Sequence, residues 1–189
     1  MADEPSNLRT VGANSVPSST PTSRPFPTKR TSWSELKQII LQDNDLARLR
    51  RCQKDQQTYD DYMTKVVKTH YKSVMDFILD SKLDVPTQID PSSGKKYAMI
   101  EKVTNERKCL VRNDFPYYFD TAVDHWILWK LGGSGEISAS EIDEAKMDLN
   151  QQLGDVVDFL HWINPPALKS IPEIDHVHIL CLRKGEAST

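Results

Sequence analysis

Two histidines near the end of the chain, His176 and His178, lie two residues apart in the apolar run IDHVHILCL. Side chains alternate between the two faces of a strand, so both imidazoles are expected on one face of a strand over about residues 174–182. A second strand-like segment, HWILW, begins at His125. If the two strands pair, the three imidazoles can lie on one surface.

Three imidazoles close to a carboxylate such as Asp114 would suit more than one kind of chemistry. Neutral imidazole is a good ligand for zinc or iron, and it also suits acid–base or phosphoryl chemistry near neutral pH. Because the spacing does not choose between these, we predict His125, His176, His178 and Asp114 as candidate catalytic residues, assign no metal ligand and leave the cofactor open. In the alternative interpretation one histidine is a polar outer-face residue and another is hydrogen-bonded in the core.

Known motifs narrow the enzyme classes. A histidine-triad transferase would need a further histidine where this chain has Leu180, and a cupin would need an acid soon after His178, where only Glu186 follows. The chain has no P-loop, GxGxxG, GxSxG or HExxH motif. Most enzyme classes that a motif can identify are therefore excluded.

Polar and aromatic residues around the segment NDFPY could instead bind a small molecule. Pro116 cannot donate to a sheet and closes the strand before it, while Asn113 and Asp114 carry the short acceptors of capped turns. Indoles can stack on a sugar or base ring, and an arginine can pair with phosphate or carboxylate. The predicted ligand-binding residues are Arg112, Asn113, Tyr117, Trp129, Asn164 and Ser170.

Length, charge and cysteine content limit the class of protein. A chain of 189 residues suffices for one domain with a proper core. A net charge of -3, with only short basic pairs such as Arg50-Arg51, predicts neither nucleic acid nor a membrane as partner. Three cysteines without a CxxC argue against a disulfide framework or a zinc ribbon, and no apolar run is long enough to span a bilayer. We expect a cytoplasmic location, leave a nuclear one open, and name no protein partner.

The chain divides by composition into a tail and one domain. Residues 1–31 are rich in Pro, Ser and Thr and poor in large apolar side chains, so a disordered tail is predicted. Residues 32–184 form the predicted domain, and residues 185–189 are expected to fray. Ser32 and Glu35 have the spacing of a capping box and predict a helix that begins at Trp33.

The domain is predicted to have an α+β fold. A short helix is expected around Leu46, and apolar periodicity predicts longer helices over residues 56–83 and 138–163. Strands are predicted over residues 97–103, 108–112, 125–130 and 174–182. The expected architecture is a small, mainly antiparallel sheet of three to four strands packed against helices on one side.

Several motifs in order give the chain a family resemblance. These are WSELK from Trp33, NDFPY from Asn113, HWILW from His125 and NPPALKSIPEIDHVHI from Asn164. In these motifs the chain resembles a fungal family of small proteins named after an N-acetylglucosamine-induced member, over about residues 32–183. The resemblance implies a cytoplasmic protein linked to the amino-sugar response, and it transfers no catalytic residue.

Three functions fit these observations. The first is a protein that binds a small polar ligand, sugar-like or phosphate-like, in a pocket lined by His, Asn, Asp and Trp. The second is a metal-dependent or histidine-based hydrolase or transferase that uses the same pocket. The third is a non-catalytic interaction scaffold whose aromatic residues are core.

Overall fold

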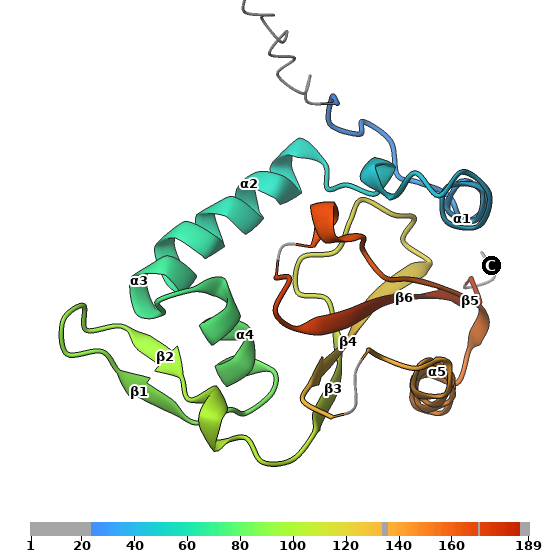
Figure 1. Ribbon diagram of the computed structural model, residues 1–189. Helices are drawn as coiled ribbons and strands as arrows, with labels where there is room; N and C mark the ends of the chain where they lie inside the picture. The colour runs from blue at the N-terminus through green and yellow to red at the C-terminus, as the bar shows by residue number, and fades with distance from the viewer. Residues whose placement is uncertain (1–23, 134–135, 170, 186–189) are drawn as a thin grey trace, which may run out of the picture.

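The protein is built around a four-stranded antiparallel sheet with the strand order β3-β4-β6-β5 (Figure 1). The computed structural model describes residues 24–133, 136–169 and 171–185. The sheet strands are β3 (Arg107–Arg112), β4 (Val123–Leu131), β5 (Val156–Trp162) and β6 (Asp175–Arg183). A separate hairpin pairs β1 (Thr87–Ile89) with β2 (Lys96–Ala98). The α+β class and the antiparallel sheet are thus confirmed.

Helices occupy the N-terminal half of the chain and the connection between β4 and β5. The α-helices are α1 (Trp33–Lys37), α2 (Gln53–Tyr62), α3 (Lys68–His70), α4 (Val74–Ser81) and α5 (Ala139–Leu153). Short π or 3-10 segments are η1 (Gln38–Asp43), η2 (Leu46–Arg48), η3 (Met63–Val67), η4 (Ile100–Lys102) and η5 (Pro166–Leu168). None of the described helices is long and apolar enough to cross a membrane.

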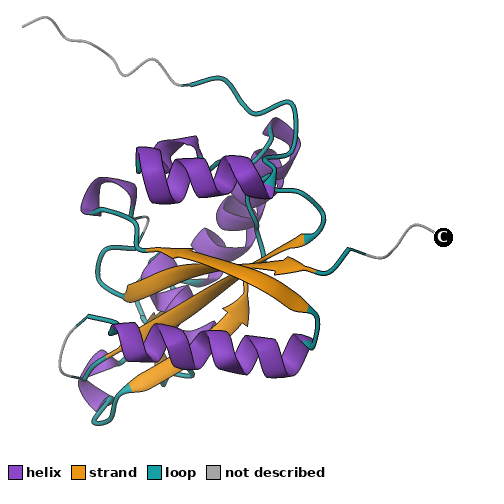
Figure 2. Ribbon diagram, turned by 90° about the vertical axis from the view of Figure 1, so that its right-hand side faces the viewer, coloured by secondary structure: helices purple, strands orange, loops and turns teal. Residues whose placement is uncertain are grey.

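Helices cover both faces of the sheet rather than one side, which corrects the sequence prediction (Figure 2). Strands β4 and β6 are buried on both faces, because alternate residues enter different cores. Trp126 and Ile179 pack with α5 on one face, whereas Ile127 and Trp129 pack with α4 on the other. The N-terminal helices and α5 therefore form the two outer layers.

Strand β5 was missed because its spacing resembles that of a helix. Leu153, Val156, Val157 and Leu160 repeat at three- and four-residue intervals, and the predicted helix over 138–163 includes them. In the structure α5 ends at Gly154, whose positive φ of 74° is typical of a helix C-terminus. A register shift between Val156 and Asp158 then explains why the strand lacks a clean alternation.

The predicted helix over residues 56–83 is interrupted. The helical run α2-η3-α3 ends at Tyr71, which is extended and forms a bridge with Lys96. Ser73 then caps α4 by accepting from the backbone N–H of Asp76 at 3.0 Å. The break lets α4 turn back onto the sheet.

The predicted strand over residues 97–103 is mostly irregular. Only β2 is extended, and it pairs with β1 outside the main sheet. The chain continues as the 3-10 segment η4 before β3 begins. By contrast, the capping box of α1 is present: the Ser32 N–H donates to Glu35 at 2.9 Å, and the Ser32 hydroxyl accepts from the Glu35 N–H at 3.4 Å.

The described part of the predicted tail, residues 24–31, lies against the domain. Arg24 pairs with Asp45 at 2.9 Å, and Arg30 donates to the Phe119 carbonyl at 2.6 Å. Thr31 bridges Phe119 as a short parallel pairing, so these backbone contacts place the segment beside the core. The rest of the tail, 1–23, and residues 186–189 lie outside the described residues.

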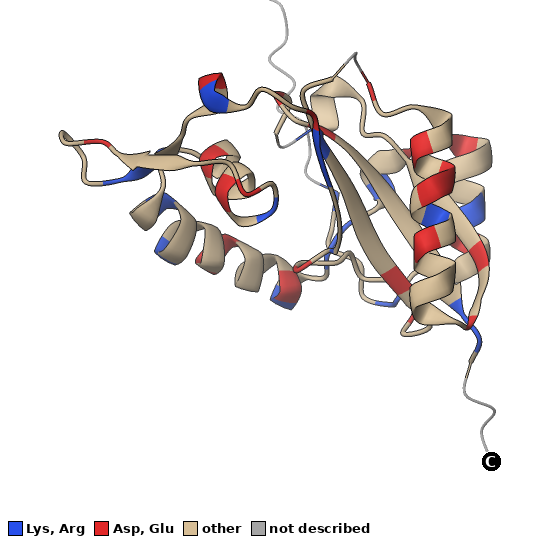
Figure 3. Cartoon of the chain, turned by 90° about the horizontal axis from the view of Figure 1, so that it is seen from below, with Lys and Arg blue, Asp and Glu red and all other residues tan. Residues whose placement is uncertain are grey.

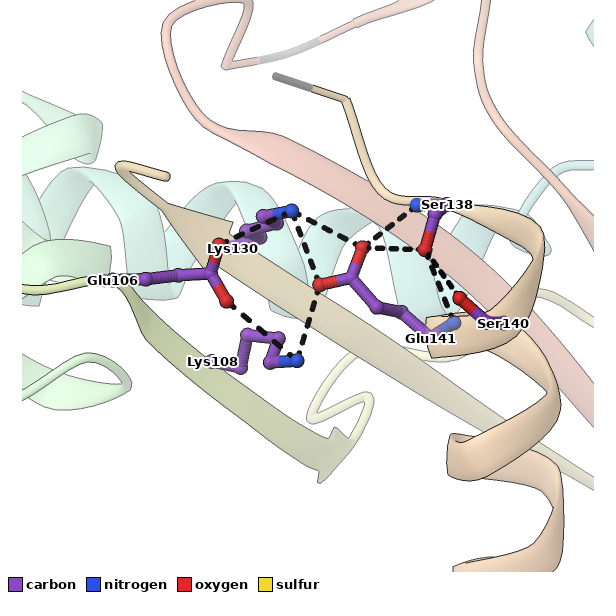
Figure 4. A network of polar contacts seen from close by, with 6 residues as sticks. All are labelled: Glu106, Lys108, Lys130, Ser138, Ser140 and Glu141. Atoms are coloured by element: carbon purple, nitrogen blue, oxygen red, sulfur yellow. Dashed lines mark hydrogen bonds and ion pairs between the residues drawn. The ribbon is translucent and has the colours of Figure 1, made fainter. Parts of the chain in front are cut away.

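A buried lysine joins α5 to the sheet. Lys130 of β4 faces α5, a helix whose charged positions are mostly acidic (Figure 3). Its ammonium lies 3.1 Å from the Glu141 carboxylate and 3.3 Å from that of Glu106 (Figure 4). The hydrogen bond from the Ser138 N–H and, to a smaller extent, that from Lys130 lower the pKa of Glu141 to about 2. The same carboxylate therefore caps α5 and neutralises a buried cation.

Candidate functional site

A pocket of about 300 Å³ lies between the N-terminal helices and the sheet face that carries the histidines. Helices α2 and α4 contribute aromatic and aliphatic walls, including Tyr59 and Phe77. The turn after β3, the loop before β6 and strand β6 contribute most of the polar groups. The polar side chains that line the pocket are Arg51, Lys82, Arg112, Asn113, Asp114, Tyr117, Asn164, His176 and His178.

The two distant segments named from the sequence come together here, because β4 pairs with β6 in an antiparallel register. Every predicted site residue except His125 and Ser170 lines the pocket. His125 is buried just behind the wall. Ser170 lies outside the described residues. The shared position is observed, and the functional roles of these residues stay predictions.

Two of the histidines form a buried hydrogen-bonded pair. Nε2 of His125 lies 2.9 Å from Nδ1 of His178. At the far end of each imidazole stands an asparagine: Nδ2 of Asn113 is 3.3 Å from His125 Nδ1, and Nδ2 of Asn164 is 3.2 Å from His178 Nε2. The result is a continuous polar chain, Asn113-His125-His178-Asn164, between β3, β4 and β6.

The orientation of each asparagine amide is fixed by a second partner. The Phe115 backbone N–H donates to Asn113 Oδ1 at 2.9 Å, and the Trp162 indole N–H donates to Asn164 Oδ1 at 3.0 Å. Both partners can only donate, so each amide must turn its oxygen to them and its NH₂ group to a histidine. Trp162 also stacks on His178, with ring centroids 4.7 Å apart and planes at 9°.

Both members of the histidine pair are neutral at physiological pH. Burial, aided by the nearby Arg51 charge, lowers the pKa of His125 to about 3. Burial holds the pKa of His178 well below its usual value. The neighbouring His125, His176 and Arg51 lower it further. A neutral imidazole has one donor nitrogen and one acceptor nitrogen, so the pair acts through hydrogen bonds rather than charge.

His176 offers the pocket an acceptor. Its Nδ1 lies 3.0 Å from the Ile174 carbonyl oxygen, which can only accept, so Nδ1 carries the proton. Nε2 of the neutral ring is then left with a lone pair. Burial lowers the pKa of His176 and favours this neutral form, and Trp129 lies against the ring with centroids 4.7 Å apart. A ligand hydroxyl is the natural donor to such a nitrogen.

Arg51 places a guanidinium at the pocket wall. Its Nε donates to the Phe115 carbonyl at 2.9 Å, and its guanidinium carbon lies 4.3 Å from the ring centre of Tyr59 and 5.2 Å from that of Tyr117. No carboxylate in the described part of the chain forms an ion pair with it. Burial lowers the pKa of Arg51, although a guanidinium remains charged in proteins. The pocket wall therefore carries a half-buried positive charge, on which the more distant carboxylates of Asp60 and Asp55 act without forming an ion pair.

Asp114 and Arg112 are engaged away from the histidines. The Asp114 carboxylate lies 2.7 Å from Lys82 Nζ and is largely exposed. Arg112 pairs with Asp124, which also binds Arg183 at 2.9 Å. No hydrogen bond between Asp114 and an imidazole is formed among the described side chains, because Lys82, directly after α4, binds its carboxylate.

A metal centre finds little support in this geometry. The described residues contain no group of three or more His, Cys, Asp or Glu side chains arranged to hold a metal ion. The facing nitrogens of His125 and His178 are bonded to each other, and their outer nitrogens face amide groups. Only one imidazole nitrogen of the three histidines, Nε2 of His176, lacks such a partner in this arrangement.

Comparison with known proteins places the chain in a family. Residues 32–182 match the family described as Protein of unknown function, DUF3605. The chain belongs to the DUF3605 family. Uncharacterized protein YPL067C of Saccharomyces cerevisiae is 25% identical over 159 residues, which are 78% of this chain and 77% of the yeast protein. The crystal structure of HTC1 is similar with a TM-score of 0.49 and 23% identity, covering 81% of this chain and 85% of that chain.

The sequence did not reveal Arg51, which lines the pocket of this DUF3605 protein, or Trp162, which contacts the lining residues Asn164 and His178. Arg51 was treated as half of a solvated basic pair, and Trp162 was assigned to a helix. Arg51 meets Tyr59 only through the fold. Trp162 and Asn164 are two residues apart, and this spacing is a local signal for the indole–amide contact. Both lie within the residues that the DUF3605 family match covers.

Proposed function

We propose that this DUF3605 protein binds a small polar molecule that carries an anionic group, with the anion held by Arg51. The observation that carries the proposal is the half-buried guanidinium without an ion-pair partner among the described residues. A charge that is half-buried without an ion-pair partner costs part of the free energy of full burial. An anionic ligand offsets that cost, and a guanidinium binds phosphate or carboxylate oxygens through paired hydrogen bonds.

The rest of the pocket suits a ligand with hydroxyl groups and a ring. His176 Nε2 is an acceptor for a hydroxyl, and the amide of Asn164 and the imidazole of His178 supply further polar contacts. Tyr59 and Phe77 give the pocket an apolar wall against which a sugar ring can pack. A volume of about 300 Å³ is at the lower end for ligand pockets and fits one monosaccharide phosphate better than a dinucleotide.

The resemblance to the N-acetylglucosamine-induced family supports an amino-sugar phosphate as the first ligand to test. It also supports a cytoplasmic site of action, where such phosphates occur.

Catalysis by the histidines is a weaker proposal. The pKa values of His125 and His178 are lowered by burial, which makes both poor bases at neutral pH. The carboxylate that would orient them, Asp114, is paired with Lys82 instead. We therefore favour binding over a hydrolase or transferase.

A thermal-shift series on the full chain tests the proposal, because a ligand that binds only the folded state raises the melting temperature. The compounds are inorganic phosphate, N-acetylglucosamine phosphate and neutral N-acetylglucosamine. We expect the sugar phosphate to raise the melting temperature most, and Arg51→Gln to abolish the rise.

Arg50→Gln is the matched control. It removes the same charge from the neighbouring residue, which donates to Arg24 and Pro25 carbonyls away from the pocket. It is expected to bind like the wild type. Equal shifts in all three proteins would overturn the proposal, and no shift with any compound would favour the interaction scaffold.

A further inference from the structure

The polar chain Asn113-His125-His178-Asn164 contains one hydrogen-bond donor too many. Both amides direct an NH₂ group toward a histidine, because Phe115 and Trp162 hold their oxygens. Each end would be satisfied if the outer nitrogen of its histidine accepted. The two ring protons would then both lie on the facing nitrogens of His125 and His178, which are only 2.9 Å apart.

Two neutral tautomers remain, and each leaves one end with two donors facing each other. If His178 donates to His125, then His125 Nδ1–H faces the Asn113 amide; if His125 donates to His178, then His178 Nε2–H faces the Asn164 amide. The two end contacts are the longer ones, at 3.3 and 3.2 Å. A third ring proton would only add a donor, so protonation does not relieve the conflict.

The Asn164 end can be relieved from the pocket. Asn164 and His178 both line it, whereas His125 does not. An acceptor oxygen placed beside them would receive hydrogen bonds from His178 Nε2–H and from the Asn164 amide. His178 Nδ1 would then accept from His125, and His125 Nδ1 would accept from Asn113. Every link of the chain would have one donor and one acceptor.

We infer that in the ligand-free protein His178 Nδ1–H donates to His125, and that the pocket ligand places an oxygen of its oxyanion, a phosphate or a carboxylate, between His178 and Asn164. Binding then selects the other tautomer, with Nε2–H on His178. This inference rests on the proposed anionic ligand, and it gives the anion a second set of binding side chains in addition to Arg51. The subsite requires an acceptor, so it rejects a ligand that presents only donors there. The tautomer change passes through both imidazoles, so binding in the pocket also alters the hydrogen bond between His125 and Asn113. Neither imidazole changes its charge.

The test is the proton position on the ring nitrogens, observed by nitrogen-15 NMR of histidine-labelled full chain. The probes are inorganic phosphate, acetate and, as a donor-only control, methylammonium at the same ionic strength. We expect phosphate or acetate to convert His178 Nε2 to a protonated nitrogen and His125 Nδ1 to an unprotonated one, whereas methylammonium changes neither. A response to phosphate alone or to acetate alone identifies the oxyanion.

Trp162→Phe provides a second test that needs no ligand. Phenylalanine keeps an aromatic ring against His178 but removes the indole N–H that holds Asn164 Oδ1. The amide is then free to turn its oxygen to His178, so the variant without ligand should show the protonated Nε2 that the wild type acquires with phosphate. Phosphate should change its ring nitrogens little.

The outcomes separate this inference from the proposed function. Phosphate binding that depends on Arg51 but leaves the ring nitrogens of the wild type unchanged would overturn the acceptor subsite and leave the anion pocket intact. An unprotonated His178 Nε2 in a folded Trp162→Phe variant would also overturn it. Absence of binding by phosphate, acetate and N-acetylglucosamine phosphate would overturn both.

Discussion

Nε2 of His125 on β4 and Nδ1 of His178 on the neighbouring strand β6 are 2.9 Å apart on one face of the sheet. Both imidazoles are buried, and His178 lines the pocket while His125 lies behind it. Each imidazole is held from the other side by an asparagine. The same contacts make the histidines parts of the core and the inner wall of a candidate binding site, so their protonation is linked to stability.

The protein should begin to lose stability at pH values well above those at which carboxylates titrate. The folded pKa of His125 is about 3 and that of His178 is also depressed, whereas both approach 6.5 when unfolded. Between these values the unfolded chain binds more protons, so stability is full above pH 6.5 and is lost as the pH falls. Each histidine should remove about 1.4 kcal/mol per pH unit below 6.5.

Urea unfolding at pH 7 and pH 5 measures this loss. His70 is exposed on α3, so His70→Gln is expected to show the wild-type pH dependence. His125→Gln should reduce the dependence, because one buried imidazole is gone. An unfolding free energy that is equal at pH 7 and pH 5 would show that the pair is not held neutral.

Gly154 should be required for the transition from α5 to β5. Its φ of 74° is strained for a residue with a side chain, although an added Cβ would meet no atom within 4 Å. Gly154→Ala should therefore cost about 1 kcal/mol from backbone strain alone. Gly154→Asn should cost less, because asparagine tolerates the left-handed region. Equal stability of Gly154→Ala and wild type in urea would contradict the left-handed conformation of Gly154 at the end of α5.

The ion pair between Lys130 and Glu141 should couple α5 to the sheet. Lys130→Met leaves the Glu141 carboxylate with Lys108 at 3.1 Å and the cap of α5, but without its partner on β4. The single variant should lower the melting temperature, and Glu141→Gln in the same chain should recover part of the loss. Additive effects of the two changes in calorimetry would show that the pair is not coupled.

The strands around the site were predictable because their pattern is local. Alternation in HWILW and IDHVHILCL placed His125 and His178 on strands, and their pairing brought the imidazoles together. Strand β5 was not predictable in this way, since the spacing of Leu153 to Leu160 fits a helix and only Gly154 marks the change.

The cation of the pocket was beyond a local pattern. Arg50 and Arg51 are adjacent in sequence, yet Arg50 binds the N-terminal segment and Arg51 lies between aromatic rings from α2 and the Pro116 turn. Burial of a charged side chain is decided by tertiary packing, which residue type does not encode. The contact of Asp114 was likewise beyond a local pattern: its carboxylate lies in the same pocket as His176 and His178, and Lys82, directly after α4, binds it.

Anion binding at Arg51 can be measured by calorimetric titration of wild type, Arg51→Gln and Arg50→Gln with N-acetylglucosamine phosphate. Loss of charge-assisted hydrogen bonds should weaken binding to Arg51→Gln about tenfold or more, while Arg50→Gln binds as the wild type does. Binding that is equally strong in Arg51→Gln, or absent from the wild type, would contradict the account.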